Sequence, residues 1–292
     1  MDAVIPYVDG SDPLWRSDYR TVVPEPVVER RYRDWGTLPF LLRGIGRHLP
    51  FVDRVILVVA RESQIPAWAD RSRLRVVLHG DFIPEAFLPT FNSTTIELFL
   101  HRIPGLSERF LYFNDDIFPV RDTVEADFYP DGRPATGFAH HLLACNLFKK
   151  QTRRSDALAR EALGLPRSRF FLRPQHTCSP MLRSACEELF GLVGPQLLDS
   201  ITPVRNEKNV NQYVFLDYLY LSGRACARRR SCRHISLATA TARSLENAIG
   251  HPDRQFLCIN DVDMEARRYA VLRETLQSAF LARFPEKSPY EL

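Results

Sequence analysis

The hydrophobic residues of the chain fall into short continuous runs and into longer stretches with helical spacing. The runs 3–8, 55–60 and 74–78 have the length and composition of buried strands. Between the first two runs, Leu38, Leu41, Leu42, Ile45 and Leu49 recur at helical spacing, and Pro50 closes that stretch. Strands that alternate with helices predict an α/β fold with a mainly parallel sheet.

The rest of the chain continues this alternation. We expect a helix that begins near Thr94, with Thr94 and Glu97 as a capping box, and Glu97 and His101 are spaced to form a pair on one helical face. Further strands are predicted at 109–113 and 256–259, and further helices at 181–190 and 212–221. The last helix is expected to bury one stripe, which consists of Tyr269, Leu272, Leu276 and Phe280.

Two of the predicted strands end on neighbouring polar residues. The run 109–113 stops at Asn114, Asp115 and Asp116, and the run 256–259 stops at Asn260 and Asp261. Ligands of open α/β sheets bind at the carboxyl ends of strands, and adjacent carboxylates suit a hard cation such as Mg²⁺. A turn in which Asn and Asp cap the backbone is the alternative for the first group, and a helix cap before Met264 is the alternative for the second.

The first predicted strand runs into a turn at Asp9, Gly10, Ser11 and Asp12, with Pro13 behind it. Gly10 is expected to be free to adopt positive φ, and a glycine-containing loop after a first strand is a common place for a nucleotide. The turn lacks the spaced glycines of a dinucleotide fingerprint, so the nucleotide reading rests on position alone.

Composition and charge narrow the class of protein. The chain has 292 residues, of which 45% are hydrophobic and 25% charged, and a formal charge of +4. This is the composition of a globular protein, and its mild, arginine-based charge favours local phosphate binding over nucleic-acid binding. The dense basic run at 228–230 is either a solvated loop or a contact for an acidic polymer or a lipid headgroup.

The sequence shows no membrane span, no secretory signal and few cysteines. No run reaches the roughly 20 apolar residues of a membrane span, and the first residues do not resemble a secretory signal. The six cysteines are too few for a disulfide framework in a chain of this length, so a reduced cytoplasmic protein is expected. Cys226, Cys232 and His234 are the only cysteine-containing metal set that the spacing suggests.

Ordered motifs extend over most of the chain. They are IPYVDGSDP at 5–13, RYRD at 31–34, QIP at 64–66, LPTFNS at 88–93, IE at 96–97, HRIPGLS at 101–107, NDD at 114–116, PQH at 174–176, VRN at 204–206, NQY at 211–213 and FLCIND at 256–261. In this order they resemble the four regions of the Stealth family, which includes bacterial capsular polysaccharide phosphotransferases and the animal N-acetylglucosamine-1-phosphotransferase.

The resemblance implies a single catalytic domain over 1–292 with a Rossmann-like fold similar to that of nucleotide-sugar transferases. The segments 148–169 and 223–250 match least and are expected to be an insertion and a variable segment. The implied reaction transfers a sugar 1-phosphate from a UDP-N-acetylhexosamine to a hydroxyl of a glycan or polysaccharide and releases UMP. No nucleic-acid partner is expected, and peripheral contact with the inner face of the cell membrane is an open expectation.

The family implies roles for particular residues. His176 would be the general base, Arg205 would bind the diphosphate, and Asp116 would act with Asp115 or Asp261 on Mg²⁺ or Mn²⁺. From the residues alone, His176 and Arg205 could equally be an ordinary hydrogen-bonded histidine and a surface ion pair. The remaining donor-binding assignments are Asp9, Gly10, Ser11, Asp12, Asn92, Arg102 and Asn260.

The chain departs from the family pattern at Trp35, Thr37 and Asn209, where the family usually has an asparagine, a glutamate and an acidic residue. These changes bear on the acceptor and the donor sugar. Two other functions remain open at this stage. One is a metal-dependent glycosyltransferase that releases UDP, and the other is a noncatalytic module that binds phosphorylated glycans.

Overall fold

A five-stranded sheet forms the centre of the computed structural model, which describes all 292 residues. Its strand order is β3-β2-β1-β4-β9, in which β1 (Asp2–Pro6) lies parallel to β2 (Arg54–Val59) and to β4 (Arg109–Tyr112). The edge strands are β3 (Arg75–Leu78), which is parallel, and β9 (Ser179–Leu182), which is antiparallel. The predicted α/β fold with a mainly parallel, Rossmann-like sheet is confirmed.

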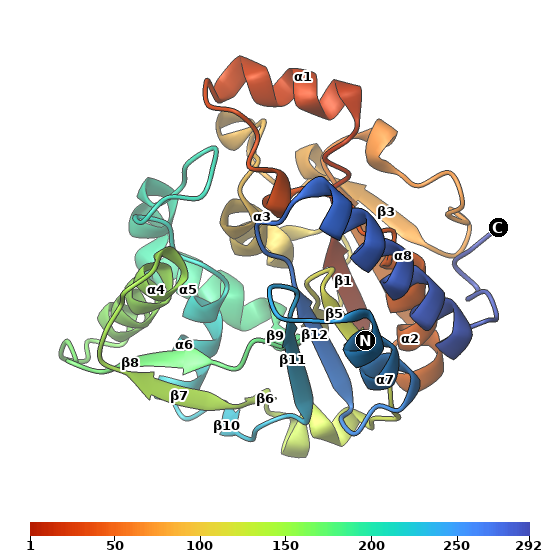
Figure 1. The fold of residues 1–292 in the computed structure, drawn as a ribbon. Helices are drawn as coiled ribbons and strands as arrows, with labels where there is room; N and C mark the ends of the chain where they lie inside the picture. The colour runs from red at the N-terminus through yellow and green to blue at the C-terminus, as the bar shows by residue number, and fades with distance from the viewer.

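Helices cover both faces of this sheet (Figure 1). The helices are α1 (Pro13–Val22), α2 (Leu38–His48), α3 (Ser93–Phe99), α4 (Leu147–Ala162), α5 (Arg183–Asp199), α6 (Tyr213–Leu221), α7 (Ala242–Gly250) and α8 (Ala266–Arg283). Successive side chains of a strand point to opposite faces, so the central strands contribute side chains to two separate hydrophobic cores. Ala3 and Ile5 pack with α2, α7 and α8, whereas Val4 packs with α3, α5 and α6.

A second sheet lies beside the first and has the order β11-β12-β5. Its strands are β5 (Ile117–Pro119), β11 (Cys232–Ser236) and β12 (Phe256–Asn260). Only four residues separate β4 from β5, so the chain passes directly from the first sheet to the second. Asp115 and Asp116 lie in this short connection. Two strand pairs complete the structure: β6 (Ala135–Thr136) with β10 (Cys226–Ala227), and β7 (Phe138–His141) with β8 (Phe171–Pro174).

The segments that match the family least have regular structure. Residues 148–169 belong to α4 and the loop after it, and α4 packs against α6 and β8 on the left of Figure 1. Residues 223–250 include β10, β11 and α7, and α7 packs against α8. No helix is both long and apolar enough to cross a membrane.

Several local predictions are wrong. The cap of α3 is Asn92, whose side chain accepts the Thr94 backbone N–H at 3.1 Å, so the Thr94 and Glu97 capping box does not form. His101 pairs with Glu187 at 2.9 Å rather than with Glu97. The predicted helix at 181–190 begins at Arg183, because residues 179–182 form β9.

Gly10 does not adopt positive φ. Its backbone N–H donates to the Tyr32 carbonyl at 2.7 Å, and a Cβ at this position would lie only 2.4 Å from the same oxygen. The close approach of two backbone segments, rather than left-handed geometry, is therefore what requires glycine here.

Candidate active site

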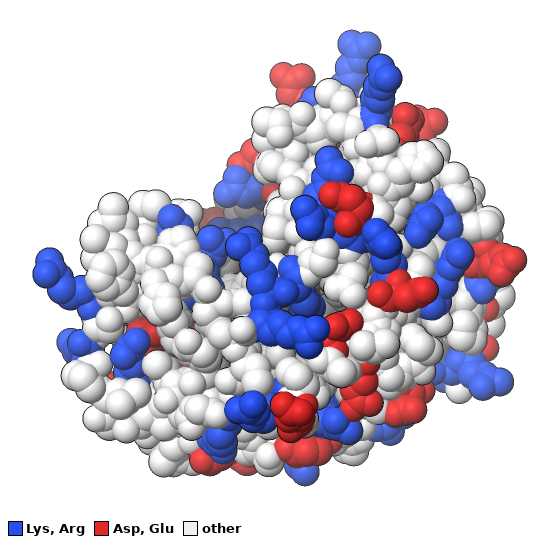
Figure 2. Space-filling view, turned by 90° about the horizontal axis from the view of Figure 1, so that it is seen from below, with Lys and Arg blue, Asp and Glu red and all other residues white.

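A cavity of about 680 Å³ opens between the carboxyl ends of β1, β4 and β12 and the lobe of α4 and α6. This volume lies within the usual range for ligand sites. Asp116, His176 and Arg205 all line this cavity, although they lie far apart in the sequence, and so do Asp115, Asn260 and Asp261. Figure 2 shows the molecule hollowed between its left lobe and the remainder, with Lys and Arg side chains beside the hollow.

The connection between β4 and β5 places the two carboxylates. Its Ile117 N–H donates to the Asn114 carbonyl at 3.2 Å, which closes a tight turn. The Ile259 N–H of β12 donates to the Asp116 carbonyl at 2.9 Å, which ties the turn to the second sheet. Residues 114–116 therefore form a turn, as the alternative interpretation predicted, and they also line the cavity. Backbone hydrogen bonds hold Asp115 and Asp116 in the cavity wall.

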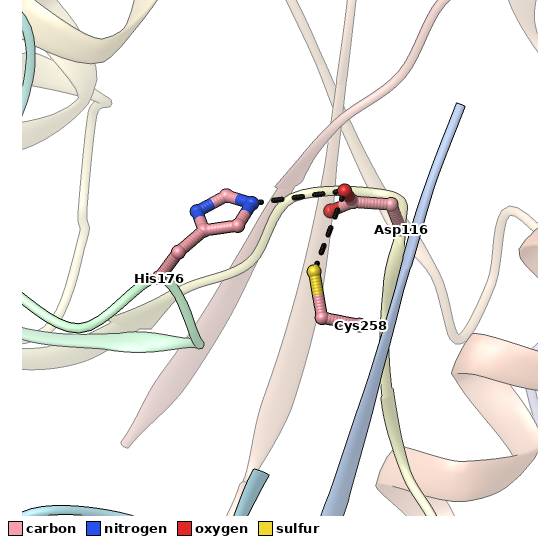
Figure 3. Close-up of side chains that lie close together, drawn as sticks. All are labelled: Asp116, His176 and Cys258. Atoms are coloured by element: carbon pink, nitrogen blue, oxygen red, sulfur yellow. Dashed lines mark hydrogen bonds and ion pairs between the residues drawn. The ribbon is translucent and has the colours of Figure 1, made fainter. Parts of the chain in front are cut away.

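Asp116 is the centre of a small cluster (Figure 3). One of its oxygens, Oδ2, lies 3.7 Å from His176 Nε2 and 3.7 Å from Cys258 Sγ. The other oxygen, Oδ1, is buried without a hydrogen-bond partner. A buried carboxylate oxygen usually has a partner, so this one is available to a ligand.

His176 lies in the connection between β8 and β9, where its ring is about a quarter exposed. Phe148 and His234 flank the imidazole, with ring centroids at 6.4 Å and 6.2 Å. Burial opposes protonation, but the Asp116 carboxylate beside the ring and the more distant Glu97 raise the pKa of His176 above its ordinary value. This direction favours uptake of a proton near neutral pH.

Asp115 is exposed to the cavity, yet protein surrounds it on the remaining sides. This enclosure, together with the Asp116 and Asp34 carboxylates, raises the pKa of Asp115 to about 7. Adjacent carboxylates repel each other, and a cation between them removes that repulsion.

These residues fit a divalent cation. Asp115 and the unpartnered oxygen of Asp116 are hard oxygen donors of the kind that Mg²⁺ and Mn²⁺ bind. His176 Nε2, Asp116 and Cys258 Sγ also lie within 4.8 Å of one another, but the thiol is a softer ligand. Burial and the Asp116 carboxylate raise the pKa of Cys258 well above its usual value, so the thiol serves as a hydrogen-bond donor to Asp116.

Five arginines line the same cavity, and they fall into two groups. Arg30 and Arg33 form ion pairs with Asp263 and Asp261. Arg31, Arg173 and Arg205 have no carboxylate partner: Arg173 lies over the Phe148 ring, and Arg205 donates only to the Ser93 hydroxyl, at 2.6 Å. Three unpaired guanidinium groups in one cavity have the charge and the donors that binding of a multiply charged anion requires.

Asp261 differs from Asp116. Its two oxygens accept a bidentate pair from Arg33, at 2.6 Å from Nε and 3.0 Å from Nη2, and its Oδ1 also accepts the Val262 N–H. The Arg33 guanidinium in turn lies over the Tyr269 ring at 5.0 Å. The Asp261–Arg33 pair therefore connects the segment after β12 to the loop before α2, and the ring contact connects that loop to α8.

The loop that carries Arg205 is fixed by two asparagines. Asn92 Nδ2 donates to the Thr202 carbonyl and to Asn209 Oδ1, both at 3.0 Å. Asn209 Nδ2 donates to the Ser200 carbonyl at 2.6 Å and to the Thr202 hydroxyl at 2.8 Å. An acidic residue at position 209 could not make these two donations, which explains why asparagine suits this chain.

The sequence reasoning missed a buried network beneath the cavity. Asn114 Nδ2 donates to the Tyr112 hydroxyl at 3.0 Å, which donates to Glu97 at 3.2 Å, and Glu97 also accepts the Gln212 N–H. Burial raises the pKa of Glu97. The capping-box reading concealed Glu97, because its partners lie on β4 and at the start of α6.

Several predicted donor-binding residues lie outside the cavity lining. Asp9 accepts from Ser11, and Asp12 caps α1 and accepts from Gln64 at 2.7 Å. Asn92 is fully buried behind the lining, and Arg102 pairs with Glu187 at 3.0 Å. The nucleotide-binding roles of Asp9, Gly10, Ser11, Asp12, Asn92 and Arg102 stay predictions, and any such role would be indirect in this arrangement.

The proposed metal set of Cys226, Cys232 and His234 is wrong. The group that the fold assembles is Asp116, His176 and Cys258. Cys226 and Cys232 lie on separate two- and three-stranded sheets, so their closeness in sequence does not bring their thiols together.

A smaller cavity of about 120 Å³ adjoins the large one at the ends of β1 and β4. Trp15, Tyr32 and Phe91 form an aromatic wall, and Arg31 and Arg205 line both cavities. Trp15 and Phe91 meet edge to face with ring centroids 5.2 Å apart. The two cavities together have aromatic side chains at one end, and both arginines and carboxylates in the middle.

Residues 31–135 match the model of the Stealth proteins' conserved region 2. Over 331 aligned positions the chain is 27% identical to the capsular polysaccharide phosphotransferase WcwK of Streptococcus pneumoniae, covering 100% of this chain and 98% of the relative. It is 28% identical over 327 positions to the exopolysaccharide phosphotransferase cps2G of Lactiplantibacillus plantarum, covering 100% and 96%.

The chain is similar to the Stealth family. The relatives carry the name phosphotransferase, and this chain is a transferase. Among solved structures, the galactosyltransferase LgtC in complex with donor and acceptor sugar analogues aligns over 97% of this chain and 96% of its own, with 12% identity and a TM-score of 0.46.

Proposed function

We propose that this Stealth-like protein transfers a sugar 1-phosphate from a nucleotide sugar to a hydroxyl of a glycan acceptor and releases a nucleoside monophosphate. The observation that carries the proposal is the meeting of Asp115, Asp116, His176 and unpaired arginines in one cavity. Phosphoryl transfer requires charge neutralisation, alignment of the nucleophile and a proton acceptor, and each of these tasks has a residue here.

The donor would occupy both cavities. A pyrimidine ring suits the small cavity beside Trp15 and Phe91, and Arg31 and Arg205, which line both cavities, would bind the diphosphate at their junction. Asn260 lines the large cavity and would contact the sugar. The donor that we propose is a UDP-N-acetylhexosamine.

Transfer would proceed by direct displacement at the phosphorus that carries the sugar. The acceptor oxygen forms a bond to this phosphorus, and the bond from the phosphorus to the bridging oxygen breaks. The electron pair leaves with UMP, and the hydroxyl proton passes to the His176 imidazole. Asp116 lies 3.7 Å from Nε2 and stabilises the imidazolium that forms.

Asp115 and Asp116 would hold Mg²⁺ or Mn²⁺. When bound there, the cation would supply charge neutralisation for the diphosphate. We assign Asp261 to a positioning role through Arg33, because both of its oxygens already accept from that guanidinium.

The acceptor would be a capsular or other cell-surface polysaccharide, as the names of the relatives WcwK and cps2G suggest. It would enter on the side of Phe148 and Arg173, which line the cavity next to His176. We place the reaction in the cytoplasm, where nucleotide sugars are available.

The nucleotide product tests this proposal. Purified protein is incubated with Mg²⁺, a panel of UDP-sugars and a panel of capsule oligosaccharides, and the nucleotides are identified by mass spectrometry. UMP together with a sugar phosphodiester is the expected result. UDP would instead identify a glycosyltransferase that attacks the anomeric carbon, and no consumption of any donor would point to a noncatalytic module.

Two histidine variants control for loss of folding. His176→Ala should lower turnover by about 10² to 10⁴-fold, the usual contribution of a general base. His251→Ala is the matched control, because His251 is exposed at the end of α7 and does not line the cavity. Equal activities of the two variants would remove the base role from His176.

A further inference from the structure

The outer end of the β7–β8 ladder exposes apolar side chains that no other part of the chain covers. The paired strands place His141 opposite Phe171, and continuing this register by one residue places Leu142 opposite Phe170. The exposed fractions of Leu142, Leu143 and Phe170 are 46%, 71% and 51%, and that of Leu165 in the adjoining loop is 39%. We call these four residues the apolar tip.

The backbone of the tip is held in place, so the exposure is built into the fold. Arg153 of α4 donates to the Leu142 carbonyl, and its guanidinium lies 5.2 Å from the centroid of the Phe171 ring. Phe171 and Leu172 of β8 are buried immediately behind the tip. Apolar side chains clustered on a supported edge mark an interaction surface, in contrast to apolar residues scattered singly.

Positive charge surrounds the tip. The segment 141–173 contains eight Lys and Arg against two Asp and Glu, a net charge of +6, whereas the whole chain has a net charge of +4. The remainder of the chain is therefore acidic overall. Lys and Arg side chains project at the left edge of Figure 2, the side on which Figure 1 shows α4, β7 and β8.

Three of these cations are free to contact a partner. Arg154, Arg167 and Arg169 are exposed, and none of them forms an ion pair or a side-chain hydrogen bond within the chain. Arg167 and Arg169 lie in the exposed loop between α4 and β8, close in sequence to Leu165 and Phe170. Apolar and cationic groups therefore alternate along the same edge.

We propose that the apolar tip and its flanking arginines bind the surface of an anionic lipid bilayer. Short apolar side chains inserted at the headgroup level, together with several Lys or Arg, are the two signals that reversible membrane attachment needs. A protein partner for such a cationic edge would have to be strongly acidic, and a bilayer with anionic headgroups offers both an acidic surface and an apolar interior.

This surface is connected to the cavity. Strand β8 runs from the tip to Pro174, and His176 follows two residues later. At about 3.3 Å per residue, the four residues of β8 span about 13 Å. Attachment at the tip would hold the cavity at that distance from the membrane, within reach of an acceptor anchored there.

Vesicle co-sedimentation tests the surface without donor, acceptor or turnover, so its outcome is independent of the proposed reaction. The full-length protein is mixed with vesicles of phosphatidylcholine alone or with an equal part of phosphatidylglycerol. We expect binding to the anionic vesicles only, and a fall of about tenfold or more when NaCl is raised from about 0.1 M to about 0.5 M.

Two variants and one control separate the tip from other exposed apolar residues. L142S/L143S/F170S and R154E/R167E/R169E should each lower vesicle binding by about tenfold or more. V271S/L281S should bind like the parent protein, since both residues are comparably exposed on α8, at 53% and 51%. Circular dichroism and thermal melting verify that all three variants are folded.

Three results would overturn the proposal. The first is no binding of the parent protein to anionic vesicles, and the second is unchanged binding by both tip variants. The third is a protein that self-associates in sedimentation velocity and is made monomeric by L142S/L143S/F170S, because the tip would then be an interface between two copies.

Discussion

Two strand ends with nearly the same sequence have different surroundings in this protein. β4 leads into Asn114, Asp115 and Asp116, and β12 ends in Asn260 followed by Asp261. One oxygen of Asp116 has no partner, and the other faces His176 and Cys258. Both oxygens of Asp261 are bound by Arg33. The first carboxylate is thus available to a ligand, whereas the second is committed to the structure.

The difference shows that a strand-end carboxylate is only a candidate until its partners are known. Arg33 is 228 residues away from Asp261 in the sequence, so no local pattern reveals the pair. We therefore propose that Asp116 contacts substrate and cation, whereas Asp261 positions Arg33.

The largest difference is expected in turnover. Asp116→Asn removes the charge beside His176 and should lower kcat by about 10³-fold or more, as loss of a preorganised charge does in other active sites. Asp261→Asn keeps one acceptor oxygen for Arg33 and should lower kcat/KM by about 10-fold to 10²-fold. Both are measured as UMP release, and equal losses would break the comparison.

Stability should change in the opposite order. Asp261→Ala leaves the largely buried Arg33 guanidinium without its partner and should lower the free energy of unfolding by about 1–3 kcal/mol. Asp116→Asn should stay within about 0.5 kcal/mol of the parent, since it also reduces the repulsion with Asp115. Urea denaturation measures both values. A more stable Asp261→Ala protein would remove the positioning role.

The response to Mg²⁺ should depend on pH through Asp115. Burial and the neighbouring Asp116 raise the pKa of Asp115 from 3.8 to about 7, so the folded protein keeps this proton at pH values where the unfolded chain has lost it. The folded state therefore loses stability as pH rises from about 4 to about 7, and a cation restores it only once the proton has left.

Differential scanning fluorimetry checks this dependence. The rise in Tm caused by Mg²⁺ should grow as pH passes through about 7 for the parent and for Asp261→Asn, and it should be small and flat for Asp115→Asn. If the Asp261→Asn protein alone lost the response, the cation would belong at the other strand end.

The smallest effect is expected at Cys258. Its Sγ lies 3.7 Å from the Asp116 carboxylate and 3.5 Å from Asn260 Oδ1, two acceptors for its single proton, and the residue is fully buried. Cys258→Ser keeps a donor and should lower kcat by about 2-fold, whereas Cys258→Ala removes the donor and should lower it by about 10-fold. A serine variant weaker than the alanine variant would contradict a hydrogen-bonding role.

Much of the fold could be predicted from the sequence, because strand length and helical spacing are local properties. The central strands β1, β2, β3 and β4 and the helices α2, α6 and α8 appear within a few residues of their predicted positions. α1 escaped notice because its buried face consists of only Trp15 and Tyr19. The start of α5 was misplaced because an antiparallel strand, β9, directly precedes it.

The site was less accessible to sequence reasoning. Asp116, His176 and Arg205 were found through motifs, and the structure brings them to one cavity. Arg173 was not found, since nothing local distinguishes an unpaired arginine, and Glu97 was named only as a capping or pairing residue of its helix and as part of the IE motif. Arg102 shows the converse case: its motif matched, but Glu187 occupies its guanidinium at 3.0 Å. Long-range pairing decides such roles.

The most direct test of the division between the two strand ends is Mn²⁺ binding in the presence of UDP, followed by electron paramagnetic resonance. The account predicts that Asp116→Asn loses the bound Mn²⁺ signal, whereas Asp261→Asn retains it with an affinity close to that of the parent protein. Retention of the signal by Asp116→Asn, or its loss in Asp261→Asn, would contradict the account.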